Sequence, residues 1–231
     1  DPSKSNITTD EDAYKLALAD AVNVLENSPF ELCPDYRQLF RWTEPEDWQL
    51  KERIWAMPRS PEAGDANSAL TMWALPNYYN GTSDVPTFGR CRPDRWFYQK
   101  WCEAFGGTKG TGDKNSTIYT SSMDPRMDAN IAHTSYKGKG GTPHNLYPTK
   151  NRIHQTTASM VKYYGAPYYK KYYDPKYDNC VGNADFYVMR MAEVYLGYAE
   201  VCAALGDDVT AKQYLKTIRE RSFPAGKADT D

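Results

Sequence analysis

The side chains that could support catalysis or metal binding lack the spacing that either chemistry needs. The three histidines, His133, His144 and His154, are too far apart in sequence to form a helical zinc-binding pair such as His-Glu-x-x-His. Residues 107–116 are rich in Gly, Lys and Thr, but they lack the phosphate-binding motif Gly-x-x-x-x-Gly-Lys-Ser/Thr and are interpreted as a flexible linker. We therefore expect no catalytic residue, no metal site and no cofactor.

Acidic side chains leave one enzymatic alternative open. The chain has 30 Asp and Glu residues, and no pair of them stands out in sequence. The two acids of a glycoside hydrolase need only be close in space, about 5 to 10 Å apart, and folding can bring together any two. A glycoside hydrolase is therefore kept as an alternative function.

Residues suited to binding a ligand are more evident in the sequence than residues suited to catalysis. The chain is polar, with a mean hydropathy of -0.77, yet it contains 19 Tyr and 6 Trp. Sugars present apolar C–H faces and a fringe of hydroxyls, so they are bound by flat aromatic rings together with hydrogen-bonding side chains. The segment Trp-Ala-Leu-Pro-Asn-Tyr-Tyr-Asn at residues 73–80 supplies both, and two further candidates follow it closely. The predicted ligand-binding residues are Trp73, Asn77, Tyr78, Tyr79, Arg90 and Trp96.

A helical hairpin is the clearest element that could position such residues. Apolar residues recur every three to four positions between Val188 and Leu205, and again from Val209 to Arg221, within the stretch 185–222. Gly206 stands at a C-cap position, and the two aspartates that follow it are N-cap candidates for the second helix. The first helix is apolar on nearly every face, so we expect it to lie between other elements.

Five charged residues lie within this apolar hairpin, and we expect them to be structural. Burying an unpaired charge costs several kcal/mol, roughly, so these residues should pair with each other or with backbone groups. The expected contact runs from Glu193 or Glu200 to the end of the hairpin that carries the last two arginines. The predicted ion-pair residues are Arg190, Glu193, Glu200, Arg219 and Arg221.

Further elements are predicted along the chain. A helix should begin at the Thr-Asp-Glu-Asp sequence of residues 9–12 and end near 27–29, and another should cover 93–105. Alternation in 52–57 predicts a short buried strand, and residues 124–131 are expected to lead into a strand. The stretch 58–93 has no periodicity but is too rich in aromatics to be disordered, so we interpret it as a functional loop.

The hairpin also resembles a known family. Arg-Met-Ala-Glu-Val-Tyr-Leu-Gly-Tyr-Ala-Glu at 190–200, followed by a short turn and Ala-Lys-Gln-Tyr-Leu-Lys-Thr-Ile-Arg-Glu-Arg at 211–221, is similar to the C-terminal signature of the SusD/RagB family of Bacteroidetes outer-membrane nutrient-binding lipoproteins. Asp-Pro-Arg at 124–126 and the aromatic-rich sequence of 30–40 match the family's pattern too. The resemblance runs with gaps from about residue 10 to 223. Family members are about twice as long, so the chain resembles their C-terminal half.

The resemblance implies a mainly α fold, a SusD-like α-α superhelix of tetratricopeptide-like hairpins with long loop-rich insertions and a few short strands. Residues 1–231 would form a single domain, a piece of a longer protein: a helix and strand lead-in at 1–57, a loop-rich ligand-facing region at 58–184 and the hairpin at 185–223. The implied function is non-catalytic capture of oligosaccharides or polysaccharides at the cell surface, for uptake by a SusC-like TonB-dependent transporter. The implied location is the outer membrane, through a lipid anchor absent from this sequence.

Composition excludes two classes of partner and leaves other questions open. A net charge of -2, with basic residues scattered along the chain, gives no footprint for nucleic acid. No apolar run is long enough to cross a membrane. A helical-repeat module that binds a peptide or a protein remains an alternative, since such arrays present a concave face. The five cysteines include no Cys-x-x-Cys pair, and a bond between Cys91 and Cys102 is left open.

Overall fold

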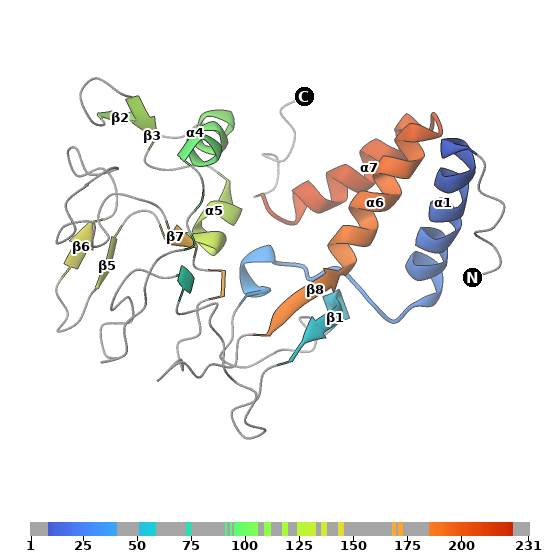
Figure 1. Ribbon diagram of the computed structural model, residues 1–231, viewed down its shortest axis with the longest axis horizontal. Helices are drawn as coiled ribbons and strands as arrows, with labels where there is room; N and C mark the ends of the chain where they lie inside the picture. Colours follow the sequence, from blue (N-terminus) through green and yellow to red (C-terminus); the bar gives the residue numbers. More distant parts are fainter. Residues whose placement is uncertain are drawn as a thin grey trace. The chain divides into compact units, whose positions relative to one another are not determined.

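In the computed structural model, the chain forms two compact units (Figure 1). The domain organisation expected from the sequence stays a prediction. Unit 1 consists of Asp1–Leu39, Pro45–Met57 and Tyr187–Asp231, and unit 2 of Phe40–Glu44 and Pro58–Phe186. The structure describes residues 9–40, 51–58, 73–74, 91, 93, 95–105, 109–111, 117–119, 124–132, 135–137, 143–145, 168–169, 171–172 and 185–223.

The described residues of unit 1 include three long helices. They are α1 (Asp10–Asn27), α6 (Met191–Ala204) and α7 (Asp208–Glu220). Helix α6 packs against both α1 and α7 and lies between them in Figure 1. The expectation that this apolar helix lies between other elements is therefore confirmed. The unit also contains the short 3-10 helix η2 (Tyr36–Gln38) and the two-stranded sheet of β1 (Arg53–Met57) and β8 (Phe186–Arg190).

The ends of the three helices follow from local sequence. Thr9 caps α1 in a capping box with Asp12, in which each side chain accepts a hydrogen bond from the other residue's backbone N–H. The Asp207 side chain accepts from the Thr210 N–H at the start of α7. Gly206, with φ at 89°, makes the left-handed turn between α6 and α7. The predicted caps of the hairpin are confirmed.

The start of the hairpin was predicted incorrectly. Residues 186–190 were assigned to the stretch of two helices, but they form the strand β8, and α6 begins only at Met191. A short apolar run such as Phe-Tyr-Val-Met fits a strand as well as a helix, and pairing with β1 decides between them. Strand β1 lies where it was expected but is not fully buried, because Trp55 is 62% exposed.

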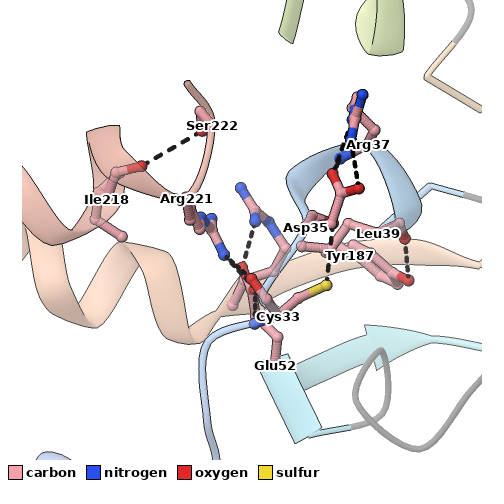
Figure 2. Close-up of polar contacts among 10 residues, drawn as sticks. Cys33, Asp35, Arg37, Leu39, Glu52, Tyr187, Ile218, Arg221 and Ser222 are labelled. Atoms are coloured by element: carbon pink, nitrogen blue, oxygen red, sulfur yellow. Dashed lines mark hydrogen bonds and ion pairs between the residues drawn. The ribbon is translucent and has the colours of Figure 1, made fainter. Parts of the chain in front are cut away.

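Glu52 is the central ionic contact of unit 1 (Figure 2). Its side chain is fully buried, with Oε1 2.7 Å from Arg190 Nη1 and Oε2 2.5 Å from Arg221 Nη1. The Cys33 N–H donates to Oε2 over 2.6 Å, and Arg221 also donates to the Cys33 carbonyl. One carboxylate therefore joins three segments that lie far apart in the sequence.

The expected partner of Arg221 was therefore wrong. Glu193 and Glu200 are exposed on α6, and neither forms an ion pair with Arg190, Arg219 or Arg221 among the residues that the structure describes. Exposed carboxylates are solvated by water and need no partner, whereas the buried guanidinium of Arg221 does. The residue that meets this need is Glu52, which directly precedes β1.

In its described residues, unit 2 contains helices α4 (Arg95–Ala104) and α5 (Pro125–Asn130) and three antiparallel strand pairs. Its core is formed by Tyr98 and Cys102 of α4 with Met127 and Ile131, against which Trp101 and Tyr169 pack. The strand pairs are β2 (Lys109–Thr111) with β3 (Thr117–Tyr119), β4 (Ile131–Ala132) with β7 (Tyr168–Tyr169), and β5 (Ser135–Lys137) with β6 (Pro143–Asn145).

Two predictions in unit 2 need correction. The sequence after Asp124 was expected to lead into a strand, but Asp124 caps a helical turn and Pro125 occupies its first position, so α5 forms before β4. The segment interpreted as a flexible linker contains β2, which is paired with β3. Cys33, Cys91, Cys102 and Cys202 are free thiols, so Cys91 and Cys102 are not joined.

Glu52→Ala should lower the free energy of unfolding by about 3 to 5 kcal/mol, because it removes the buried carboxylate that two largely buried arginines bind. Urea denaturation followed by circular dichroism measures the effect. The matched control is Glu31→Ala, which removes an exposed ion pair to Lys51 and should cost less than about 1 kcal/mol. Equal losses in the two variants would show that Glu52 has no special role.

The two glycines of the hairpin should respond to alanine in opposite directions. Gly206→Ala should destabilise the protein by about 1 to 2 kcal/mol, since an L-residue is strained at a φ of 89°. Gly197 lies inside α6, where an added methyl group would meet open space, so Gly197→Ala should stabilise by about 0.5 to 1 kcal/mol. Thermal unfolding of both variants tests the pair, and a shift of the same sign in both would contradict it.

Candidate functional site

The six predicted ligand-binding residues are only partly within the described structure. Trp73 and Trp96 are described, and both belong to unit 2. Asn77, Tyr78, Tyr79 and Arg90 lie outside the described residues, so their role stays a prediction. The candidate site is therefore built from the two tryptophans and the elements that hold them.

Trp73 lies at the base of the predicted ligand-binding loop. Its side chain is partly buried, and the neighbouring Ala74 is buried. The Cys91 N–H donates to the Trp73 carbonyl over 2.9 Å. This bond joins the two ends of the segment 74–90, which carries the four predicted residues outside the described structure. The backbone of Trp73 is thus held at the point where that segment begins.

Trp96 is the most exposed of the described tryptophans. It lies in the first turn of α4, and 69% of its surface is accessible. Lys100 and Glu103 follow it at positions i+4 and i+7, so the three side chains lie along one face of the helix. The Lys100 Nζ is 3.0 Å from Glu103 Oε2, and both side chains are more than half exposed. The outer face of α4 thus combines a flat ring with a charged pair.

The opposite face of α4 is anchored in the core of unit 2. Tyr98 and Cys102 are fully buried. The Trp101 Nε1–H donates to Asp124 Oδ2 over 2.8 Å, and the rings of Phe97 and Trp101 meet edge to face at 5.6 Å. These contacts fix the helix that presents Trp96.

Asp124 connects α4 to α5. It is 1% exposed, caps α5 through the Arg126 N–H, and binds the Arg126 guanidinium with Nη2 2.6 Å from Oδ2. The same carboxylate accepts the Trp101 hydrogen bond, so it satisfies groups from both helices. From the sequence, Asp124 was recognised only as part of a motif. Its aspartate-x-arginine spacing is the local signal that would have indicated a cap.

Buried acidic groups are few in the described part of the chain. Its two buried carboxylates, Glu52 and Asp124, are each bound by arginine, which holds them in structural contacts. Among those residues, no cluster of three His, Cys, Asp or Glu side chains could hold a metal ion. Burial raises the pKa of the Cys33 thiol to about 11, which makes it a poor nucleophile. None of the described helices combines the length and apolar character that a membrane crossing requires.

Comparison with known proteins identifies similar chains. The model of the SusD family matches residues 51–231. A SusD-like protein from Bacteroides fragilis shares 20% identity and a TM-score of 0.64, over 95% of this chain and 45% of its own. Surface glycan-binding protein A from Bacteroides uniformis shares 20% identity and a TM-score of 0.59, over 96% of this chain and 40% of its own.

A third solved structure contains a bound sugar. Surface glycan-binding protein A from Bacteroides thetaiotaomicron, in complex with laminarihexaose, shares 18% identity and a TM-score of 0.56, over 92% of this chain and 44% of its own. The chain thus spans less than half the length of each of these three solved structures. No curated protein matches the chain by sequence. The structural similarity confirms the predicted mainly α fold.

Asp124→Ala should lower the free energy of unfolding by about 3 kcal/mol, because it removes a helix cap, the acceptor of Trp101 and the buried counter-charge of Arg126. Asp35→Ala is the matched control. Asp35 has the same contacts to Arg37 at the start of η2, but this pair is much more exposed, so the loss should be about 1 kcal/mol or less. Chemical denaturation gives both values, and a control as unstable as Asp124→Ala would contradict the prediction.

Proposed function

The chain belongs to the SusD family, and from this premise we propose that it binds oligosaccharides at a bacterial cell surface without catalysing a reaction on them. The observation that carries the proposal is the exposed ring of Trp96 on a helix anchored in the core of unit 2. A flat ring that is held in place stacks on the apolar face of a sugar without losing much conformational freedom on binding. The solved complex of a similar protein with laminarihexaose supports this class of ligand.

The absence of catalysis is supported by what the buried acids do. A glycoside hydrolase needs one carboxyl that can donate a proton and a second one that acts as a nucleophile or base. Glu52 and Asp124 are instead bound by arginines. The described residues thus provide support for binding and none for the hydrolase alternative.

The partner and location are proposed from family membership. A binding protein of this kind would hold the saccharide over a SusC-like TonB-dependent transporter, at the outer membrane, where a lipid anchor would attach it to the cell surface. Weak binding is useful in this setting, because the tethered transporter experiences a high local concentration of captured ligand. This chain spans only part of the length of its relatives, so we propose the contact with the transporter for the whole protein.

Peptide or protein binding is the second candidate, and one observation favours it. The helices of unit 1 expose apolar side chains, namely Tyr14, Leu196, Val209 and Leu215. Helical arrays commonly bind polypeptides through such surfaces. A binding test therefore needs peptide ligands as well as saccharides.

Trp96→Ala should weaken binding of laminarihexaose about 30-fold, which corresponds to the roughly 2 kcal/mol lost when a central tryptophan of a binding site is truncated. Isothermal titration calorimetry with laminarihexaose and a mixed peptide pool measures it on the 231-residue chain. Trp73→Ala, at the base of the loop, should weaken binding less.

Trp55→Ala is the control, because Trp55 is similarly exposed but lies on β1 of unit 1. It should leave the affinity for the saccharide unchanged. Binding of peptides but of no saccharide would replace the proposal with the second candidate. Unchanged affinity of Trp96→Ala for laminarihexaose would remove Trp96 from the site.

A further inference from the structure

We propose that the outer face of α4 binds two consecutive units of a neutral oligosaccharide, with Trp96 stacked against one sugar ring and the Lys100–Glu103 pair hydrogen-bonded to the next. The inference rests on the proposed function and deepens it, since it assigns two residues that the sequence did not indicate. It also states a preference for neutral over acidic saccharides. Its basis is the arrangement of three side chains on one helix.

The spacing of the three side chains sets the direction of the ligand. Lys100 lies about 6 Å along the helix axis from Trp96, and Glu103 about 10 Å, at a rise of 1.5 Å per residue. Because i, i+4 and i+7 fall on one face, the ring and the charged pair follow each other along the axis. A single sugar stacked on Trp96 would leave the charged pair unused. A chain that runs along the helix would contact both.

The charged pair suits the hydroxyls of a sugar. Lys100 supplies only donors and Glu103 only acceptors, and their facing atoms are 3.0 Å apart. Neighbouring hydroxyls of a sugar both donate and accept, so two of them can bond to the two side chains together. More than half of each side chain is exposed, so its hydrogen-bonding atoms are accessible to a ligand. An exposed ion pair contributes little to stability, and its small rearrangement on binding therefore costs little.

The balance of charge predicts which saccharides are preferred. The positive charge of Lys100 is already compensated by Glu103, so the pair offers no net attraction for a uronic acid. A ligand carboxylate would have to compete with Glu103 for Lys100 and would be repelled by Glu103 itself. Neutral hydroxyls avoid both penalties. Binding of a neutral ligand should also depend little on salt.

The helix that carries the pair is held in place. Its inner face packs Tyr98 and Cys102 into the core, and Trp101 is bound to Asp124. The other two helical Lys–Glu pairs of the described structure, on α1 and α7, have no tryptophan on their face. The Lys216–Glu220 pair of α7 is therefore a matched control for the charges alone.

The test measures binding by isothermal titration calorimetry to laminarihexaose, laminaribiose, glucose and a hexameric oligogalacturonate. The proteins are the unmodified chain and its variants Lys100→Met, Glu103→Gln and Lys216→Met. We expect the first two variants to bind laminarihexaose 3- to 10-fold more weakly and Lys216→Met to bind it unchanged. The affinity for glucose should not respond to either α4 variant. The unmodified chain should prefer laminarihexaose to the oligogalacturonate at least 10-fold.

The outcomes separate the two proposals. If the unmodified chain binds laminarihexaose and Trp96→Ala binds it about 30-fold more weakly, but Lys100→Met and Glu103→Gln bind as well as Lys216→Met, the inference is wrong and the proposed function stands. Equal affinity for the acidic hexamer would overturn the preference for neutral ligands. If the unmodified chain binds no saccharide, both proposals fail. Thermal unfolding confirms that the variants fold, which is expected because both side chains are exposed.

Discussion

Unit 1 depends on the contact of one buried carboxylate with two arginines. Glu52 is far in sequence from both Arg190 and Arg221. Burying the Glu52 carboxylate away from water would be costly without these positively charged partners. The contact fixes where the sheet of β1 and β8 meets the end of α7 and where the segment at Cys33 passes. Hydrophobic packing between α6 and its two neighbours supplies most of the stability, but packing alone does not specify these positions, whereas a directional ionic contact does.

Unit 2 also depends on a buried carboxylate that binds an arginine. Asp124 is a buried carboxylate that satisfies an arginine, a helix N-terminus and a tryptophan N–H together. In both units the oxygens of the buried carboxylate accept several hydrogen bonds. These bonds offset the cost of removing the carboxylate from water. The exposed groups are different in kind: Trp96, Lys100 and Glu103 lie on the outer face of a helix whose position the buried contacts determine. The residues that hold the fold together are thus different from the residues of the candidate site.

What could be predicted from the sequence was local. The caps at Thr9, Gly206 and Asp207 depend on residues within four positions of each other, and all three were found where expected. The identity of β8 could not be predicted in the same way, because it depends on pairing with a strand more than a hundred residues away. The role of Glu52 could not be predicted either, because its two arginine partners are more than a hundred residues away in sequence. Trp96 was predicted as a ligand-binding residue from its residue type, and that role stays a prediction. Its exposure could be read only from the structure, since a helix with a tryptophan or phenylalanine on every turn does not reveal which ring is outermost.

The sheet of β1 and β8 has a consequence for how such a protein changes during evolution. Strand β1 ends at Met57 and β8 begins at Phe186, so the chain leaves the helical unit and returns to it through two paired strands. The entropy cost of closing a connection grows only slowly with its length, by about 0.6 kcal/mol for each doubling. A change in the length of the chain between these strands should therefore cost the helices of unit 1 little stability.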